Sequence, residues 1–157
     1  MGMDNIDTMT GIPNCLTYAA GRVIFIAQKI EQCLKRIIFI EHEMGKSETF
    51  AEDISKIEKL TFENIIKEVK KYDRYLSKEG VELLINLKGK RNYVSHEIFK
   101  ELGVDKIRNE EVEQKVFREL DGIVQKFAKA EVLIWNLWKG HENEYEIFKI
   151  RNGGVNV

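Results

Sequence analysis

The chain of 157 residues contains a single proline, Pro13, close to its N-terminus. Because proline is the strongest breaker of helix interiors, its scarcity leaves long stretches of the chain free to be helical. The two cysteines, Cys15 and Cys33, are too few for a disulfide framework and lack the spacing of metal ligands. No apolar run reaches the roughly 18 residues that a membrane-spanning helix needs. From these scarcities we expect a helical protein without membrane-spanning segments.

The remaining composition is that of an ordinary globular protein. Apolar residues make up 43% of the chain and charged residues 32%, which argues against disorder. The length fits one domain. The first residues, MGMDNIDTM, are acidic and polar, unlike a signal peptide. We therefore expect a single cytoplasmic domain.

The net charge of −1 hides an uneven distribution. Residues 67–91 hold eight Lys and Arg against four Asp and Glu, whereas residues 101–121 hold four against seven. A local basic region can bind phosphates in spite of a neutral total. A solvated helix face of mixed charge explains the same pattern. Charge alone leaves both interpretations open.

Apolar spacing predicts two long helices, over residues 16–43 and 109–139. In each, apolar residues alternate steps of four and three, which places them on one stripe of a helix. The first stripe consists of Leu16, Ala20, Val23, Ala27, Ile30, Leu34 and Ile37. The second consists of Val116, Leu120, Ile123, Phe127, Ala130, Ile134 and Leu137. We expect Gly45 to stop the first helix and Asn109 to cap the second.

Two further helices are expected between these. Thr61 is a suitable N-cap for a helix through FENIIKEVKKYDRYL, and Ser77 for one from about Lys78 to Leu102, ended by Gly103. A short extra helix fits FAEDISKIEKL in the first connection. Four helices joined by short connections predict an all-α, up-and-down four-helix bundle.

The predicted organisation is a polar N-terminal segment over residues 1–15, the bundle over 16–139 and a tail over 140–157. The tail sequence YEIFKI alternates like a strand, but one strand without a partner is not stable. We therefore expect an irregular tail or arm.

The stretch KGKRNYVSHEIFK, residues 88–100, has an unusual composition for a helix. In helical projection, one face combines Asn92 and His96, which are i and i+4, with apolar residues on either side. A separate core stripe is formed by Leu83, Leu84, Leu87, Val94 and Ile98. Arg91 lies roughly 140° from His96 on the same projection. One helix would aim both side chains at one phosphate only with difficulty, whereas two copies related by a twofold axis could do so more easily.

The segment RNYVSH resembles the signature of the HEPN superfamily, the higher eukaryotes and prokaryotes nucleotide-binding domains. That signature is an Arg, usually followed by a polar residue, and a His after four to six intervening positions. Arg91, Asn92 and His96 occupy these three places. The resemblance implies a small all-α bundle that forms homodimers. It also implies a ribonuclease that needs no metal and acts as a toxin or defence effector, with an antitoxin or another protein as partner.

One position departs from a branch of that family. Where the antitoxin is a minimal nucleotidyltransferase, a Tyr that it can modify stands two residues after the His. Ile98 takes that place here, which favours another branch.

The chemistry of these residue types fits RNA cleavage. A His near its ordinary pKa of about 6.5 can take or give a proton at neutral pH, and Arg offers phosphate a planar fork of donors. We therefore assign His96 as general acid and base, Arg91 as phosphate stabiliser and Asn92 as the residue that orients His96 or donates to a nonbridging oxygen. Lys88 and Lys90 would attract the RNA backbone. No cofactor or metal is expected.

Two alternatives use the same residues. In the first, the chain is a non-catalytic homodimeric helical module that binds RNA, nucleotide or a protein partner through the same groove. In the second, Arg91 pairs with a carboxylate on a neighbouring helix and is closed to solvent, Asn92 and His96 join two copies at a dimer interface, and the segment is architectural. The other histidines, His42 and His141, are expected at the surface or at helix caps, and Trp135 and Trp138 in packing contacts.

Overall fold

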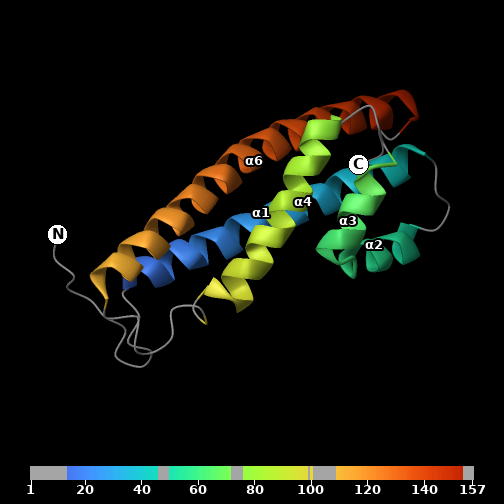
Figure 1. Cartoon of the computed structure of the whole chain (residues 1–157). Helices are drawn as coiled ribbons and strands as arrows, with labels where there is room; N and C mark the ends of the chain where they lie inside the picture. Colours follow the sequence, from blue (N-terminus) through green and yellow to red (C-terminus); the bar gives the residue numbers. More distant parts are fainter. Residues whose placement is uncertain (1–13, 46–49, 72–75, 99, 101–108, 154–157) are drawn as a thin grey trace. The chain divides into compact units, whose positions relative to one another are not determined.

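The computed structural model describes residues 14–45, 50–71, 76–98, 100 and 109–153 (Figure 1). The described residues form five helices and contain no strand. The helices are α1 (Asn14–Met44), α2 (Phe50–Glu58), α3 (Phe62–Val69), α4 (Lys78–His96) and α6 (Glu110–Arg151). The all-α prediction is therefore confirmed, including the short extra helix in the first connection. The expected stop at Gly103 lies outside the described residues.

Three of the expected N-caps are in place. Thr61 Oγ1 accepts a hydrogen bond from the backbone N–H of Asn64 at 3.3 Å. Ser77 Oγ accepts one from Gly80 at 3.1 Å. The side-chain oxygen of Asn109 accepts one from the N–H two residues later at 3.0 Å. Each cap satisfies a backbone donor that the first turn of a helix leaves without a partner, so these residues fix where α3, α4 and α6 begin.

Two helices end earlier than the sequence predicts. Helix α3 ends at Val69, whereas the expected helix ran to Leu76, which is buried in the bend before α4. Regular α4 ends at His96 and is followed by a turn at Glu97, although Ile98 and Lys100 are again helical. The rest of the predicted end, residues 101–102, lies outside the described part.

The prediction of an irregular tail is wrong for residues 140–151, because α6 continues to Arg151. Contacts with α1 account for the extension. Tyr145 packs its ring edge-to-face against Phe39 with centroids 6.4 Å apart, and Glu142 forms an ion pair with Arg36. The strand-like alternation of YEIFKI therefore gives way to tertiary contacts that require a helix.

The described chain divides into two compact units, and we consider each by itself. The first contains the described residues within 14–28 and 86–129, among them the first half of α1, the second half of α4 and the first half of α6. Its core draws on all three helices. The fully or nearly fully buried residues are Leu16, Ala20, Val23, Ile26, Ala27, Leu87, Val94, Ile98, Val116, Leu120, Ile123, Val124 and Phe127. The apolar stripes predicted from sequence supply most of this core.

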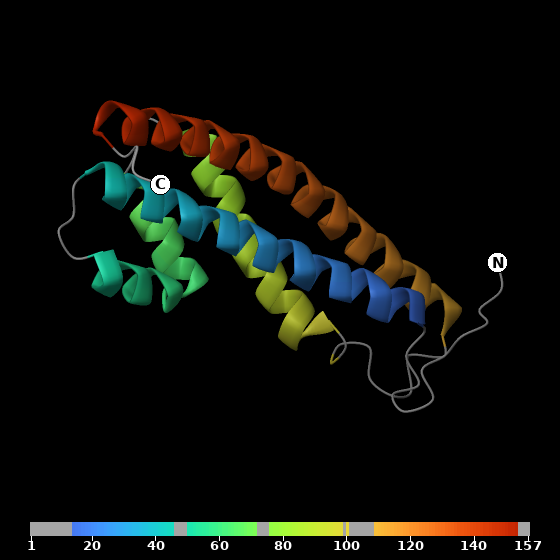
Figure 2. The same cartoon turned by 180° about the vertical axis from the view of Figure 1, so that it is seen from behind.

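The second unit contains the described residues within 29–85 and 130–153, with α2 and α3 entire. Here the second halves of α1 and α6 lie side by side (Figures 1 and 2). Lys29 of α1 pairs with Glu131 of α6, and Arg36 pairs with Glu142. Because residue numbers rise together in both pairs, α1 and α6 run parallel in this unit. Four strictly alternating helices would make the first and last antiparallel.

Candidate functional site

The three candidate catalytic residues lie on the last two turns of α4. Asn92 and His96 are both exposed, as expected for i and i+4 positions on a face turned away from the core. On the opposite side of the helix, Leu87 and Val94 are buried. The burial of that apolar stripe fixes the rotation of α4 and leaves the polar pair in solvent.

Arg91 lies at the edge between these faces and is partly exposed. Its guanidinium donates to the side-chain oxygen of Asn92 at 3.4 Å. The structure therefore brings Arg91 and Asn92 together, and Asn92 shares a face with His96. Helix geometry still separates Arg91 from His96 by roughly 140° around the axis. The partial exposure of Arg91 differs from the fully closed arginine that a purely architectural segment predicts.

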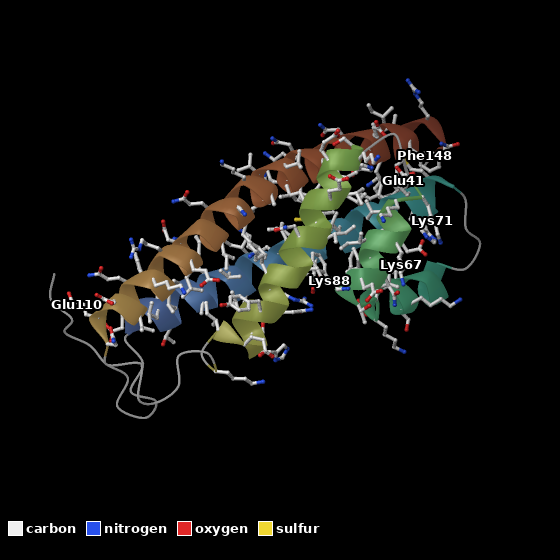
Figure 3. The ribbon with its side chains drawn as sticks, in the orientation of Figure 1. Glu41, Lys67, Lys71, Lys88, Glu110 and Phe148 are labelled. Atoms are coloured by element: carbon white, nitrogen blue, oxygen red, sulfur yellow. The ribbon has the colours of Figure 1, made fainter. Side chains whose placement is uncertain are left out.

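The two lysines expected to attract RNA flank the same segment. Lys88, labelled in Figure 3, and Lys90 are partly exposed on the second half of α4. Ile85 and Gly89 also lie on the exposed face that carries Asn92 and His96. Ile85 is 47% exposed, so the face combines apolar and polar groups as the sequence predicts.

A shallow hollow lies beside this face, within the first unit. It is lined by Lys90 and Tyr93 of α4 and by Lys115 and Glu119 of α6. Lys115 and Glu119 were not identified from sequence. Their i, i+4 spacing shows only that they share a face of α6, whereas their position opposite α4 depends on tertiary packing.

The expectation for His141 is wrong, because this residue is 1% exposed and forms part of the second core. Its Nε2 lies 3.3 Å from a carboxylate oxygen of Glu41, and its Nδ1 lies 2.8 Å from the carbonyl oxygen of Leu137. Glu41 is labelled near the end of α1 in Figure 3. The contact of Nδ1 is a hydrogen bond within α6, whereas Nε2 and the carboxylate oxygen of Glu41 lie close together without the geometry of a hydrogen bond. The close approach of His141 to Glu41 joins α1 to α6, which is a structural role.

A second polar cluster joins the same two helices. The Arg36 guanidinium lies 2.5 Å (Nε–Oε1) and 3.2 Å (Nη2–Oε2) from the Glu142 carboxylate, and the indole N–H of Trp138 donates to Oε1 at 3.0 Å. The hydrogen bond from Arg36 is the main cause that lowers the pKa of Glu142 below its ordinary value. The same hydrogen bond raises the pKa of Arg36. Arg36 also lies over the ring of Phe39, 4.9 Å from its centroid. The cluster is a link between helices.

The tryptophans contact each other, with ring centroids of Trp135 and Trp138 4.7 Å apart, although Trp135 remains 42% exposed.

Among the described residues, no group of three or more His, Cys, Asp or Glu side chains is placed to hold a metal ion. The described helices include none with both the length and the apolar character that crossing a membrane requires.

Comparison with models of known protein families, with curated proteins and with solved structures finds no match.

Proposed function

We propose that this chain is a homodimeric endoribonuclease that needs no metal, with its active site on the second half of α4. The proposal depends most on one observation: Asn92 and His96 are exposed on one face, and Asn92 is in contact with Arg91. On this face the imidazole and the amide lie side by side and are accessible to a phosphate. The resemblance of RNYVSH to the HEPN signature supports the same conclusion.

The proposed reaction is an internal transesterification of RNA. The 2′-oxygen attacks the adjacent phosphorus, a new P–O2′ bond forms, and the P–O5′ bond breaks. The proton of the 2′-hydroxyl passes to a base, and an acid returns a proton to the leaving 5′-oxygen. The products are a 2′,3′-cyclic phosphate and a 5′-hydroxyl, so this step consumes no water. His96 serves as the acid and base group, since imidazole exchanges protons near neutral pH.

The remaining residues stabilise charge and position groups. Arg91 binds the nonbridging oxygens, on which negative charge increases in the transition state. Asn92 orients His96 or donates to one of these oxygens. Lys88 and Lys90 attract the RNA backbone. The wide angle between Arg91 and His96 on one helix favours a dimer, because Arg91 of one copy and His96 of the other could face one phosphate.

The proposed architecture is an up-and-down bundle of five helices, in which the short extra helix α2 is one of the five. Five alternating helices make the first and last parallel, as α1 and α6 are in the second unit. The predicted four-helix count would not. A cytoplasmic toxin or defence effector, held in check by an antitoxin or another protein, is the setting in which such a nuclease would act.

The test is cleavage of a mixed RNA pool by the purified protein in excess EDTA. His96→Ala and Arg91→Ala should each abolish cleavage while leaving the helical circular dichroism signal unchanged. Ser95→Ala, at an exposed position one residue before His96, is the matched control and should cleave like the wild type. Equal cleavage by all variants, or no cleavage by the wild type, would refute the nuclease proposal and favour the non-catalytic binding module.

A further inference from the structure

The hollow beside the candidate site contains the three kinds of group that hold a nucleotide. Lys90 and Lys115 carry positive charge for phosphate, Tyr93 has an aromatic ring, and Glu119 has a carboxylate that accepts hydrogen bonds. The lysines and the carboxylate are contributed by two helices, so the groups face one hollow from different sides. The hollow is shallow and open to solvent, so its volume of about 570 Å³ describes a surface on which a nucleotide would lie rather than an enclosed cleft.

The hollow is adjacent to His96 along α4. Tyr93 precedes His96 by three residues, which is roughly 4.5 Å along the axis and about 60° around it. Lys90 lies roughly 9 Å and 120° from His96 by the same geometry, so the side of the hollow nearest to His96 is the one that Tyr93 lines. A nucleotide in the hollow would therefore be a neighbour of the phosphate at His96, on the same RNA strand. None of Tyr93, Lys115 and Glu119 takes part in the proposed chemical step.

We propose that this hollow is a base-recognition subsite for single-stranded RNA, which holds the nucleotide next to the scissile phosphate. Tyr93 stacks on the base, Lys90 and Lys115 contact its phosphate, and Glu119 accepts a hydrogen bond from an exocyclic amino group. Carboxylates pair in this way with the N4 amino group of cytosine, whereas uracil offers a carbonyl oxygen at that position. The subsite therefore favours cytosine over uracil. This inference rests on the proposed function for its substrate, RNA.

Direct binding tests the subsite separately from cleavage. The probes are short oligocytidine and oligouridine with 2′-O-methyl groups, which cannot undergo attack by the 2′-oxygen. Fluorescence anisotropy with the full-length protein gives Kd for each probe. The wild type should bind oligocytidine about fivefold or more tightly than oligouridine, and Glu119→Gln should reduce this ratio toward one, because an amide can pair with either edge.

Two further variants separate stacking from charge. Tyr93→Leu should weaken binding of both probes about fivefold or more, whereas Tyr93→Phe should retain it, because only the aromatic ring is needed. Lys115→Ala should weaken both probes equally and reduce the slope of log K against log salt by about 0.7. Lys126→Ala removes an exposed lysine of α6 that does not line the hollow and should change the slope less.

Equal affinity of the wild type for both probes, or equal effects of Lys115→Ala and Lys126→Ala, would overturn the subsite. These outcomes are independent of the nuclease assay. A protein that cleaves RNA but shows no base preference refutes the subsite alone. One that binds with the expected preference but does not cleave refutes the proposed chemistry.

Discussion

Replacing Glu142 by Gln should destabilise the protein at neutral pH and leave its stability unchanged at low pH. The carboxylate accepts two hydrogen bonds from Arg36 and one from the indole of Trp138. The amide of Gln keeps one acceptor oxygen but removes the negative charge. What is lost is therefore the charge-assisted part of the contact with Arg36.

The magnitude follows from geometry and exposure. Hydrogen bonds to charged groups contribute about 1.5–3 kcal/mol when they are well shielded. The side chains of Arg36 and Glu142 are 41% and 25% exposed, so solvent screening reduces this. We expect a loss of about 1 kcal/mol in the free energy of unfolding at pH 7.

The pH dependence has a definite sign. The pKa of Glu142 is lowered in the folded state, chiefly by the hydrogen bond from Arg36, so the unfolded chain binds the proton more readily. The stabilisation is then fully present above the unfolded pKa of about 4.3 and is lost as pH falls through the lower, folded value. The difference between Glu142→Gln and the wild type should shrink in the same range.

Urea unfolding of both proteins between pH 7 and pH 3 measures this difference. Glu146→Gln is the control, because Glu146 forms an exposed ion pair with Lys149 one turn away on the same helix. The control should change stability by at most about 0.5 kcal/mol. An effect of Glu142→Gln that is the same at pH 7 and at pH 3 would refute the argument, as would a more stable variant at pH 7.

Three other predictions concern the fold. Phe127→Ala, at a position with no exposed surface, should lower the free energy of unfolding by about 3–5 kcal/mol in urea titrations, and a loss below 1 kcal/mol would contradict its place in the core. Asn109→Ala should cost about 1 kcal/mol by removing the cap of α6, while Asn109→Ser should retain most of the stability, both seen as shifts in Tm. Cys33 should react with iodoacetamide more slowly than exposed Cys15 in the native protein, because burial raises the pKa of the Cys33 thiol. Mass spectrometry of the two peptides measures both rates, and faster modification of Cys33 would contradict this prediction.

Periodicity and caps made most of the helical frame predictable from sequence. The stripes of α1 and α6 recur at steps of three and four, and their residues through Ile134 are buried as expected. Thr61, Ser77 and Asn109 mark helix starts through local hydrogen bonds. Such signals depend on neighbours in sequence, which is why they could be recognised without a structure.

The errors arose where distant residues decide the outcome. The continuation of α6 to Arg151 depends on partners such as Arg36 and Phe39, roughly a hundred positions earlier in the chain. The burial of His141 depends on Glu41 in the same way. The positions of Arg91, Asn92 and His96 on one helix could be predicted, but the hollow beside them could not, since Lys115 and Glu119 reach it only through tertiary packing.

The chemical ends left on cleaved RNA test the central proposal most directly. Attack by the 2′-hydroxyl, with proton transfer through His96, predicts a 2′,3′-cyclic phosphate on one product and a 5′-hydroxyl on the other. Mass spectrometry of an oligonucleotide cut in EDTA would identify both ends, and a 2′-deoxy substitution at the cut site should prevent cleavage there. A 3′-hydroxyl with a 5′-phosphate, or continued cleavage at the deoxy position, would contradict the account.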